Sequence, residues 1–187
     1  MNVLEAIAAR RSVREYTDRP VSRETIEQLL SAAVQAPSAR NAQNWAFGVI
    51  QGRDRVREMG ERARVACLAE LDRQGVTGDF RDRLADPNVQ PFHGAAALIV
   101  IYATTQDQFA TINCSLAAQN LMLAATELGL GTCWIGIAAP LFNDPDTKRE
   151  LGVAEDYLAV APLILGYPAG DTPRRPKNPP QILFWQQ

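Results

Sequence analysis

Apolar residues near the start of the chain recur at helical spacing and predict two helices. The first ten residues read as a short helix that brings Arg10 to its end. In the second helix, apolar side chains repeat at i, i+3, i+4, i+7 and i+8 between residues 26 and 34, and Ser22 is a suitable N-cap. We expect this helix to stop before Pro37, because proline lacks an amide donor and restricts the residue that precedes it.

Four short segments have the composition of strands. Residues 46–50 follow a polar loop and are strand-like, and residues 132–136 resume in extended form after a glycine-bounded turn. Residues 95–103 and 159–167 are continuous apolar runs, the first of them rich in β-branched side chains. Runs of this kind are typical of strands that are covered on both faces.

Three further segments have helical character. Between residues 53 and 83 charged side chains dominate, which predicts one or two surface helices broken around Gly75 and Gly78. Residues 140–151 read as a turn and a short helix. Residues 113–130 read as a helix that is apolar on nearly every side, so we expect the sheet to cover one face and a partner subunit to cover the other.

The last segment, residues 168–187, is an arm with five prolines and several basic residues, and it ends in the apolar run Ile182–Trp185. Seventeen extended residues of this arm could span roughly 50 Å. Free linkers rarely end in apolar aromatic residues. We therefore expect the arm to cross a subunit surface and to dock its apolar end on the partner.

Composition narrows the class of protein. The chain has 187 residues, enough for one domain with a full core, and we treat residues 1–187 as a single domain. With 47% hydrophobic residues and a formal net charge of -2, it does not resemble a general binder of nucleic acid or of anionic membranes. No long apolar run and no signal-peptide pattern is present, so we expect a cytoplasmic protein. The three cysteines show neither a disulfide framework nor the spacing of a zinc site, and we predict no metal.

A basic cluster at residues 10–14 is the first candidate for chemistry. It holds three arginines and a serine, and the planar guanidinium fork matches the geometry of phosphate oxygens. A second basic cluster lies in the arm at residues 174–177. The alternative is a solvated helix end, where basic side chains only complement the helix dipole.

Catalysis by side chains alone is disfavoured. His93 is the only histidine, so any histidine-dependent triad must use it, and its position before a core strand favours a structural role. The glycines at residues 129–131 do not form a dinucleotide fingerprint, because they follow a helix and precede a strand. Phosphate-binding groups without an acid, a base or a nucleophile indicate that a bound cofactor carries out the chemistry.

Five stretches, taken in order, make the chain resemble the FMN-dependent nitroreductase family from residue 10 to the C-terminus. They are RRSVREY at 10–16, APSARNAQNW at 36–45, FHGAAALIVIYA at 92–103, NCSLAAQNLMLAATELGLGTCWIG at 113–136, and GYP at 166–168 followed by PRRP at 173–176. The resemblance implies an α+β fold with a central mixed β-sheet flanked by helices, in an intertwined homodimer. Two FMN sites would then lie at the interface, each built from both protomers.

The resemblance also assigns roles within the FMN site. Arg10, Ser12 and Arg174 would hold the phosphate, with Arg11 and Arg175 nearby. Arg14 would face the pyrimidine edge of the flavin, where a positive charge stabilises the reduced anionic form. From the other protomer, a loop would lie along the flavin, and its residues would be Pro37, Ser38, Ala39 and Asn41, with Gln43 as support.

Residues 133–136 would run beside N5 and O4 of the flavin. This segment is Cys133, Trp134, Ile135 and Gly136, and the amides of Ile135 and Gly136 would be the donors. We expect Cys133 to pack rather than to act in redox chemistry, because no resolving cysteine and no environment that lowers a thiol pKa is visible.

At several positions the chain departs from the common family pattern. Asn44 stands where the loop commonly has proline, and Asn113 stands where the central helix often begins with aspartate. Larger members often carry an acidic residue in place of Ile135 and a lysine in place of Thr172. These departures leave the FMN assignment intact.

The leading hypothesis is therefore an NAD(P)H oxidoreductase that uses bound FMN by ping-pong exchange. NADH or NADPH would be the reductant, and a nitroaromatic, a quinone or an enone would be the small acceptor. Alternatives are a specialised flavin enzyme, such as a dehalogenase or a flavin-destructase-like protein with a lid within residues 53–92, and a non-catalytic FMN-binding regulatory protein. A structural dimer without cofactor is the third alternative.

Overall fold

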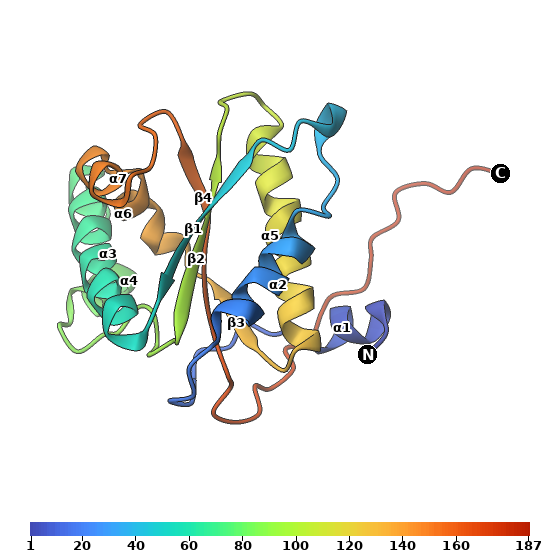
Figure 1. Ribbon diagram of the computed structural model, residues 1–187, viewed down its shortest axis with the longest axis horizontal. Helices are drawn as coiled ribbons and strands as arrows, with labels where there is room; N and C mark the ends of the chain where they lie inside the picture. The colour runs from blue at the N-terminus through green and yellow to red at the C-terminus, as the bar shows by residue number, and fades with distance from the viewer.

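The computed structural model describes residues 1–187, and its elements follow the order predicted from the hydrophobic pattern (Figure 1). The helices are α1 (Val3–Ala9), α2 (Arg23–Ala33), α3 (Arg53–Arg73), α4 (Asp79–Ala85), α5 (Ala110–Glu127), α6 (Ala139–Asn143) and α7 (Pro145–Leu151). The strands are β1 (Trp45–Gln51), β2 (Ala97–Ala103), β3 (Gly131–Trp134) and β4 (Leu158–Gly166), and two short 3-10 helices are η1 (Ala39–Asn41) and η2 (Gly136–Ala138).

Local signals account for several of the boundaries. Ser22 caps α2 by accepting a hydrogen bond from the amide of Thr25, and Asn2 caps α1 in the same way. The break between α3 and α4 falls at Gly75 and Gly78, whose φ angles of 67° and 109° favour glycine, which has no Cβ. These features confirm the helix starts and the interruption predicted from the sequence.

The four strands form one sheet in the order β1-β2-β4-β3. Every neighbouring pair is antiparallel, so the central sheet of the chain is not the mixed sheet that we expected. The reason lies in the position of β4. Strand β4 is inserted between β2 and β3, the two strands that α5 connects. Strands β2 and β3 run parallel to each other, but β4 separates them, so no parallel pair forms. The parallel component is limited to an isolated bridge between Ser12 and Thr132.

Helices cover both faces of the sheet (Figure 1). Helices α2 and α5 lie on one face, and α3, α6 and α7 lie on the other. Consequently β2 is buried at every residue. Its side chains alternate between two cores: Ile99 and Ile101 join α2 and α5, whereas Leu98, Val100 and Tyr102 join the α3 side.

One side of α5 remains uncovered within the chain. Cys114 and Leu121 on its inner side are fully buried, whereas Ile112 is 54% exposed and Leu116 is 39% exposed. The apolar side chains of the neighbouring α1 are exposed as well, including Leu4 at 76%. Within one chain only the inner side of α5 is covered, and the predicted cover of its outer side by a partner subunit stays a prediction.

The arm beyond β4 forms no helix or strand of its own. In Figure 1 it passes α1 and leads away from the body of the molecule. Its apolar run Ile182–Trp185 is 62% to 83% exposed. None of the helices combines the length and the apolar character that a membrane crossing requires.

Candidate functional site

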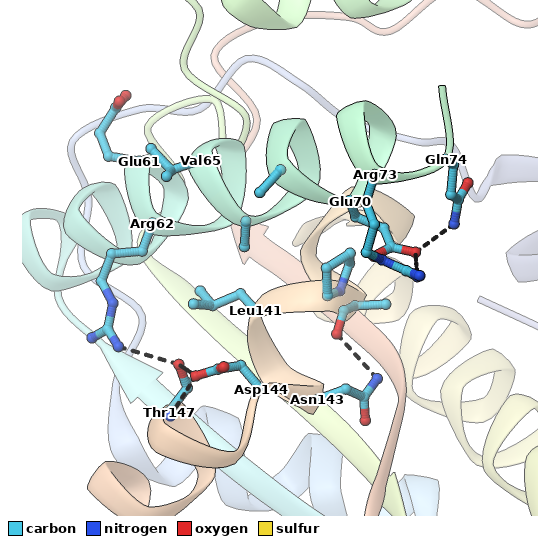
Figure 2. Close-up of a pocket in the computed structure, with 14 residues that line it drawn as sticks. Glu61, Arg62, Val65, Glu70, Arg73, Gln74, Leu141, Asn143, Asp144 and Thr147 are labelled. Carbon is cyan, nitrogen blue, oxygen red and sulfur yellow. Dashed lines mark hydrogen bonds and ion pairs between the residues drawn. The ribbon is translucent and has the colours of Figure 1, made fainter. Parts of the chain in front are cut away.

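Two cavities are large enough for a cofactor, and their charges distinguish them. The larger, about 1050 Å³, lies between α3 and α6 and reaches the start of α7 (Figure 2). Its arginines are already neutralised: Arg62 pairs with Glu150 at 2.7 Å, and Arg73 pairs with Glu70 at 2.6 Å. Figure 2 also shows the guanidinium of Arg62 directed at Thr147, to which it donates a hydrogen bond. This cavity offers no free charge to an anionic ligand.

The second cavity, which we call the basic cavity, measures about 980 Å³ and lies among α1, α5, β3 and the arm. Six basic side chains line it and no acidic one does. Its lining is Leu4, Ile7, Ala8, Arg10, Arg11, Ser12, Arg14, Gln119, Met122, Trp134, Thr172, Pro173, Arg174, Arg175 and Lys177. None of the six basic groups forms an ion pair within the chain. The cavity therefore suits a ligand that carries negative charge.

The segment after α1 is held against β3 by its alternating side chains. Val13 and Tyr16 point into the core, and the amide of Val13 donates to the carbonyl of Thr132 at 2.9 Å. The contact is so close that a Cβ at Gly131 would lie 2.6 Å from the Val13 side chain. Because Val13 faces inward, Ser12 and Arg14 on either side of it are exposed toward the cavity.

The arginines of this segment have different partners. Arg11 donates hydrogen bonds to the carbonyls of Ala8 at 2.6 Å and of Arg10 at 2.9 Å, so it closes the C-terminal end of α1. Arg10 and Arg14 make no side-chain hydrogen bond within the chain and keep their donors for a ligand. The alternative, in which basic side chains only complement the end of a helix, therefore describes Arg11 better than it describes Arg10 and Arg14.

The arm returns to the same place along the N-terminal segment. The amide of Ala169 donates to the carbonyl of Glu15 at 3.0 Å, and Arg19 lies over the ring of Tyr167 at 3.8 Å from its centre. These contacts direct the next residues of the arm to the basic cavity. Arg10 and Arg174, from opposite ends of the sequence, thus line one cavity in a single chain. That both bind one phosphate stays a prediction.

The predicted flavin loop does not reach the basic cavity in the same chain. Residues 37–43 lie at the N-terminal end of α5, where the amide of Ala39 donates to Oδ1 of Asn113 at 3.1 Å (Figure 1). The basic cavity instead meets α5 further along, at Gln119 and Met122. The predicted origin of this loop from a second protomer stays a prediction. Gln43 supports the loop through its backbone amide, which donates to Oγ of Ser38 at 3.0 Å.

The segment after β3 differs in part from our expectation. The side chain of Trp134 lines the basic cavity, whereas Cys133 is buried on the other side of the strand. The amide of Ile135 donates to the carbonyl of Pro162 at 2.9 Å, so it is not the free donor that we predicted. Its extra hydrogen bond extends the pairing of β3 with β4, which leaves the amide of Gly136 as the candidate donor.

Burial shifts the pKa of two groups near Arg14, the Cys133 thiol and the His93 imidazole. Burial raises the pKa of the Cys133 thiol, and the positive charge of Arg14 opposes this effect only in part. Burial, with a smaller contribution from Arg14, lowers the pKa of His93. Near neutral pH the thiol is protonated and the imidazole is uncharged. Both fit the structural roles predicted for them.

Sequence reasoning missed part of the lining. Leu4, Ile7 and Ala8 fall within the short helix expected over the first ten residues, and nothing in the sequence pattern shows that this helix borders a cavity. Lys177 was noted only as a basic residue of the arm. Gln119 and Met122 lie within a helix treated as uniformly apolar.

Comparisons with known proteins agree with this geometry. A family model described as "Nitroreductase family" matches residues 7–167. A protein of Archaeoglobus fulgidus, provisionally named an NADH dehydrogenase/NAD(P)H nitroreductase, is 32% identical over 171 residues, which cover 88% of this chain and 84% of the relative. An FMN reductase [NAD(P)H] of Bacillus subtilis is 26% identical, with 99% of this chain and 73% of the relative covered.

Solved structures are also similar. A nitroreductase with bound FMN from Desulfitobacterium hafniense has a TM-score of 0.84 at 26% identity and covers all of both chains. Another, from Bacteroides fragilis, has a TM-score of 0.82 at 27% identity, with 98% of this chain and 97% of the other covered.

Proposed function

The chain belongs to the nitroreductase family, and we propose that the basic cavity is its FMN phosphate site in an NAD(P)H-dependent oxidoreductase. The observation that carries the proposal is the composition of that cavity, with six unpaired basic groups and no acid, assembled from both ends of the chain. The nitroreductase and FMN reductase relatives support the same function.

The residues present fit FMN. Its phosphate carries close to two negative charges at neutral pH, and the cavity supplies guanidinium forks together with the exposed hydroxyl of Ser12. Trp134 and Met122 add apolar surface to the same cavity. A volume of about 980 Å³ lies at the upper end of the range usual for sites of small molecules and cofactors.

Five of the six basic residues that line the cavity have a distinct role in this proposal. Arg10, Ser12 and Arg174 bind the phosphate directly. Arg11 holds the end of α1, and so fixes the position from which the Arg10 side chain extends. Arg175 adds positive charge beside Arg174. Because guanidinium groups stay protonated throughout the physiological range, the site keeps its charge at any working pH.

Arg14 holds a fixed positive charge at the pyrimidine edge of the flavin. When bound, FMN would supply the redox chemistry, which is hydride uptake from NADH or NADPH and electron transfer to the acceptor. No acidic residue and no histidine lines the basic cavity, so the protein contributes binding and charge there rather than proton transfer. A single site that reductant and acceptor occupy in turn suits ping-pong exchange. We assign the acceptor to the small organic class of nitroaromatics, quinones and enones.

A second copy of the chain completes the site in this proposal. The exposed apolar side chains of α1 and α5 form the dimer surface, and the loop residues Pro37, Ser38, Ala39 and Asn41 reach the flavin of the partner. Residues 1–187 act as one domain whose arm, from about residue 168, packs on that partner. The outer edge of β1 has no strand beside it within the chain, so its backbone groups there are open to pairing with a partner segment such as the end of the arm.

Rapid mixing of FMN-loaded protein with NADH and, separately, with NADPH tests the function. We expect at least one of the two to bleach the flavin absorbance, and a nitroaromatic or a quinone to restore it in a second mixing step. Flavin that neither nucleotide bleaches would contradict the oxidoreductase assignment. Reoxidation that requires both substrates at once would contradict ping-pong exchange.

A further inference from the structure

A line of hydrogen bonds, buried at its centre, connects the loop after α2 with the start of α5. Asn113 is 2% exposed and Asn44 is 6% exposed. Nδ2 of Asn44 donates to Oδ2 of Asp107 at 3.0 Å, Nδ2 of Asn113 donates to Oδ1 of Asn44 at 2.8 Å, and the amide of Ala39 donates to Oδ1 of Asn113 at 3.1 Å. We call these four groups the amide relay.

The two ends of the amide relay fix its direction. At one end, Asp107 has a carboxylate that only accepts, and its pKa is lowered first by the Thr105 hydroxyl and then by the amide of Phe109. At the other end, the amide of Ala39 only donates. Both asparagine side chains must therefore present their NH₂ groups toward Asp107 and their oxygens toward Ala39. Any reversal places two acceptors or two donors face to face.

The amide relay ends on a strained piece of backbone. Within the flavin loop, residues 37–43, the φ angles of Arg40, Asn41 and Gln43 are 58°, 54° and 46°. Residues with a Cβ adopt this left-handed conformation only where their surroundings enforce it. Here the bond from Ala39 to Asn113 holds one side of the loop, and Oγ of Ser38 holds the other.

Asn44 and Asn113 lie far apart in the sequence and contact each other through a buried hydrogen bond. A change at either residue therefore affects the hydrogen bonds of the other.

We infer that Asn44 and Asn113 are positioning residues that hold the flavin loop in the shape in which it lies along the FMN of the partner. This inference rests on the proposed function. The two residues act through the backbone of Ala39 and do not touch the cofactor. The position of the flavin loop relative to FMN consequently depends on the direction of the hydrogen bonds in the amide relay.

Asn113→Asp tests the inference with almost no change in volume. The new carboxylate still accepts from Ala39, but its second oxygen faces Oδ1 of Asn44. We expect FMN to bind about tenfold more weakly, the effect of one disturbed buried hydrogen bond. We also expect the visible circular dichroism of the bound flavin to change, because it reports on the groups that surround the ring.

The double variant Asp107→Asn/Asn113→Asp reverses the amide relay. Asn44 then turns its amide, donates to the new carboxylate, and accepts from the new amide at position 107. We expect FMN affinity to return to within about threefold of wild type. If Asn113→Asp fails to fold, Asn113→Ala, which removes the acceptor for Ala39 without adding charge, is expected to weaken FMN to a similar degree.

Asn120→Asp is the matched control. Asn120 lies on the same helix and donates to the carbonyl of Ala32 at 3.3 Å, so the same substitution disturbs a bond that does not reach the flavin loop. We expect a lower melting temperature with unchanged flavin dichroism. Equal effects of Asn120→Asp and Asn113→Asp, or a double variant no better than Asn113→Asp alone, would overturn the inference. Wild-type protein that binds no FMN would instead overturn the proposed function on which it rests.

Discussion

Removal of residues 181–187 is expected to loosen FMN, although none of these residues lines the basic cavity. The arm contributes Arg174 and Arg175 to that cavity, and beyond them its only apolar anchor is Ile182–Trp185. Those four side chains are 62% to 83% exposed in a single chain, so their burial requires a partner surface.

The size of the effect follows from two contributions. Full burial of each of the four anchor side chains is worth roughly 1.5 to 3 kcal/mol. This gain offsets the entropy lost when the arm becomes ordered, a loss that its prolines reduce. Without the anchor, only the contact of Ala169 with Glu15 and that of Tyr167 with Arg19 hold the start of the arm. We expect the residues beyond it to become more mobile, and the phosphate to lose a charge-assisted contact worth about 1.5 to 3 kcal/mol. FMN should therefore bind roughly ten- to a hundredfold more weakly.

The assay is a titration of apoprotein with FMN, followed by flavin fluorescence, together with sedimentation to measure the dimer. Removal of Gln186 and Gln187 alone is the matched control, because it shortens the arm but keeps the anchor. We expect the control to behave as wild type. A chain lacking residues 181–187 that keeps both its FMN affinity and its dimer stability would refute the reasoning and the placement of Arg174.

Three further predictions concern the body of the molecule. Arg10→Ala should weaken FMN binding about ten- to a hundredfold at an unchanged melting temperature, since Arg10 has no partner within the chain to leave unpaired. A calorimetric titration measures the affinity and the stoichiometry. Unchanged affinity would show that Arg10 contributes only surface charge. Gly131→Ala should destabilise the fold by about 1 to 3 kcal/mol in urea unfolding, because the new methyl group meets Val13 at 2.6 Å, and a neutral effect would contradict this tight packing. All three cysteine thiols are buried and burial raises the pKa of each, to about 11 for Cys114, so no thiol should react with a disulfide reagent until the protein unfolds. Rapid modification of Cys133 in the native protein would contradict its packing role.

The spacing of apolar residues predicted the helices and strands, because each segment must bury one or both of its faces and this requirement acts within the segment. The alternating side chains of residues 97–103 serve two cores, and the sequence shows them as one apolar run between polar ends. The mixed sheet was wrong because strand order depends on where β4 is inserted, and no local pattern carries that information. The occupied amide of Ile135 escaped prediction for the same reason, since its acceptor at Pro162 lies on another strand.

The candidate site was predictable to the extent that charge carries information. Arg10 and Arg174 were assigned to one site from their residue types and the resemblance, and the structure brings them to one cavity. The contact between Asn44 and Asn113 was not predictable, because polar residues at a loop end and in a helix show no periodic signal. Exposed apolar residues such as Leu4 read in sequence like core residues, so the pattern alone does not separate a core from an interface.

The central claim is that the basic cavity binds the phosphate of FMN. The most direct measurement compares the affinity of the wild-type apoprotein for FMN with its affinity for riboflavin, which has the same ring system and no phosphate. Two charge-assisted contacts of about 1.5 to 3 kcal/mol each predict that FMN binds at least about a hundredfold more tightly, and that Arg10→Ala narrows the difference. Equal affinity for the two flavins would contradict the account.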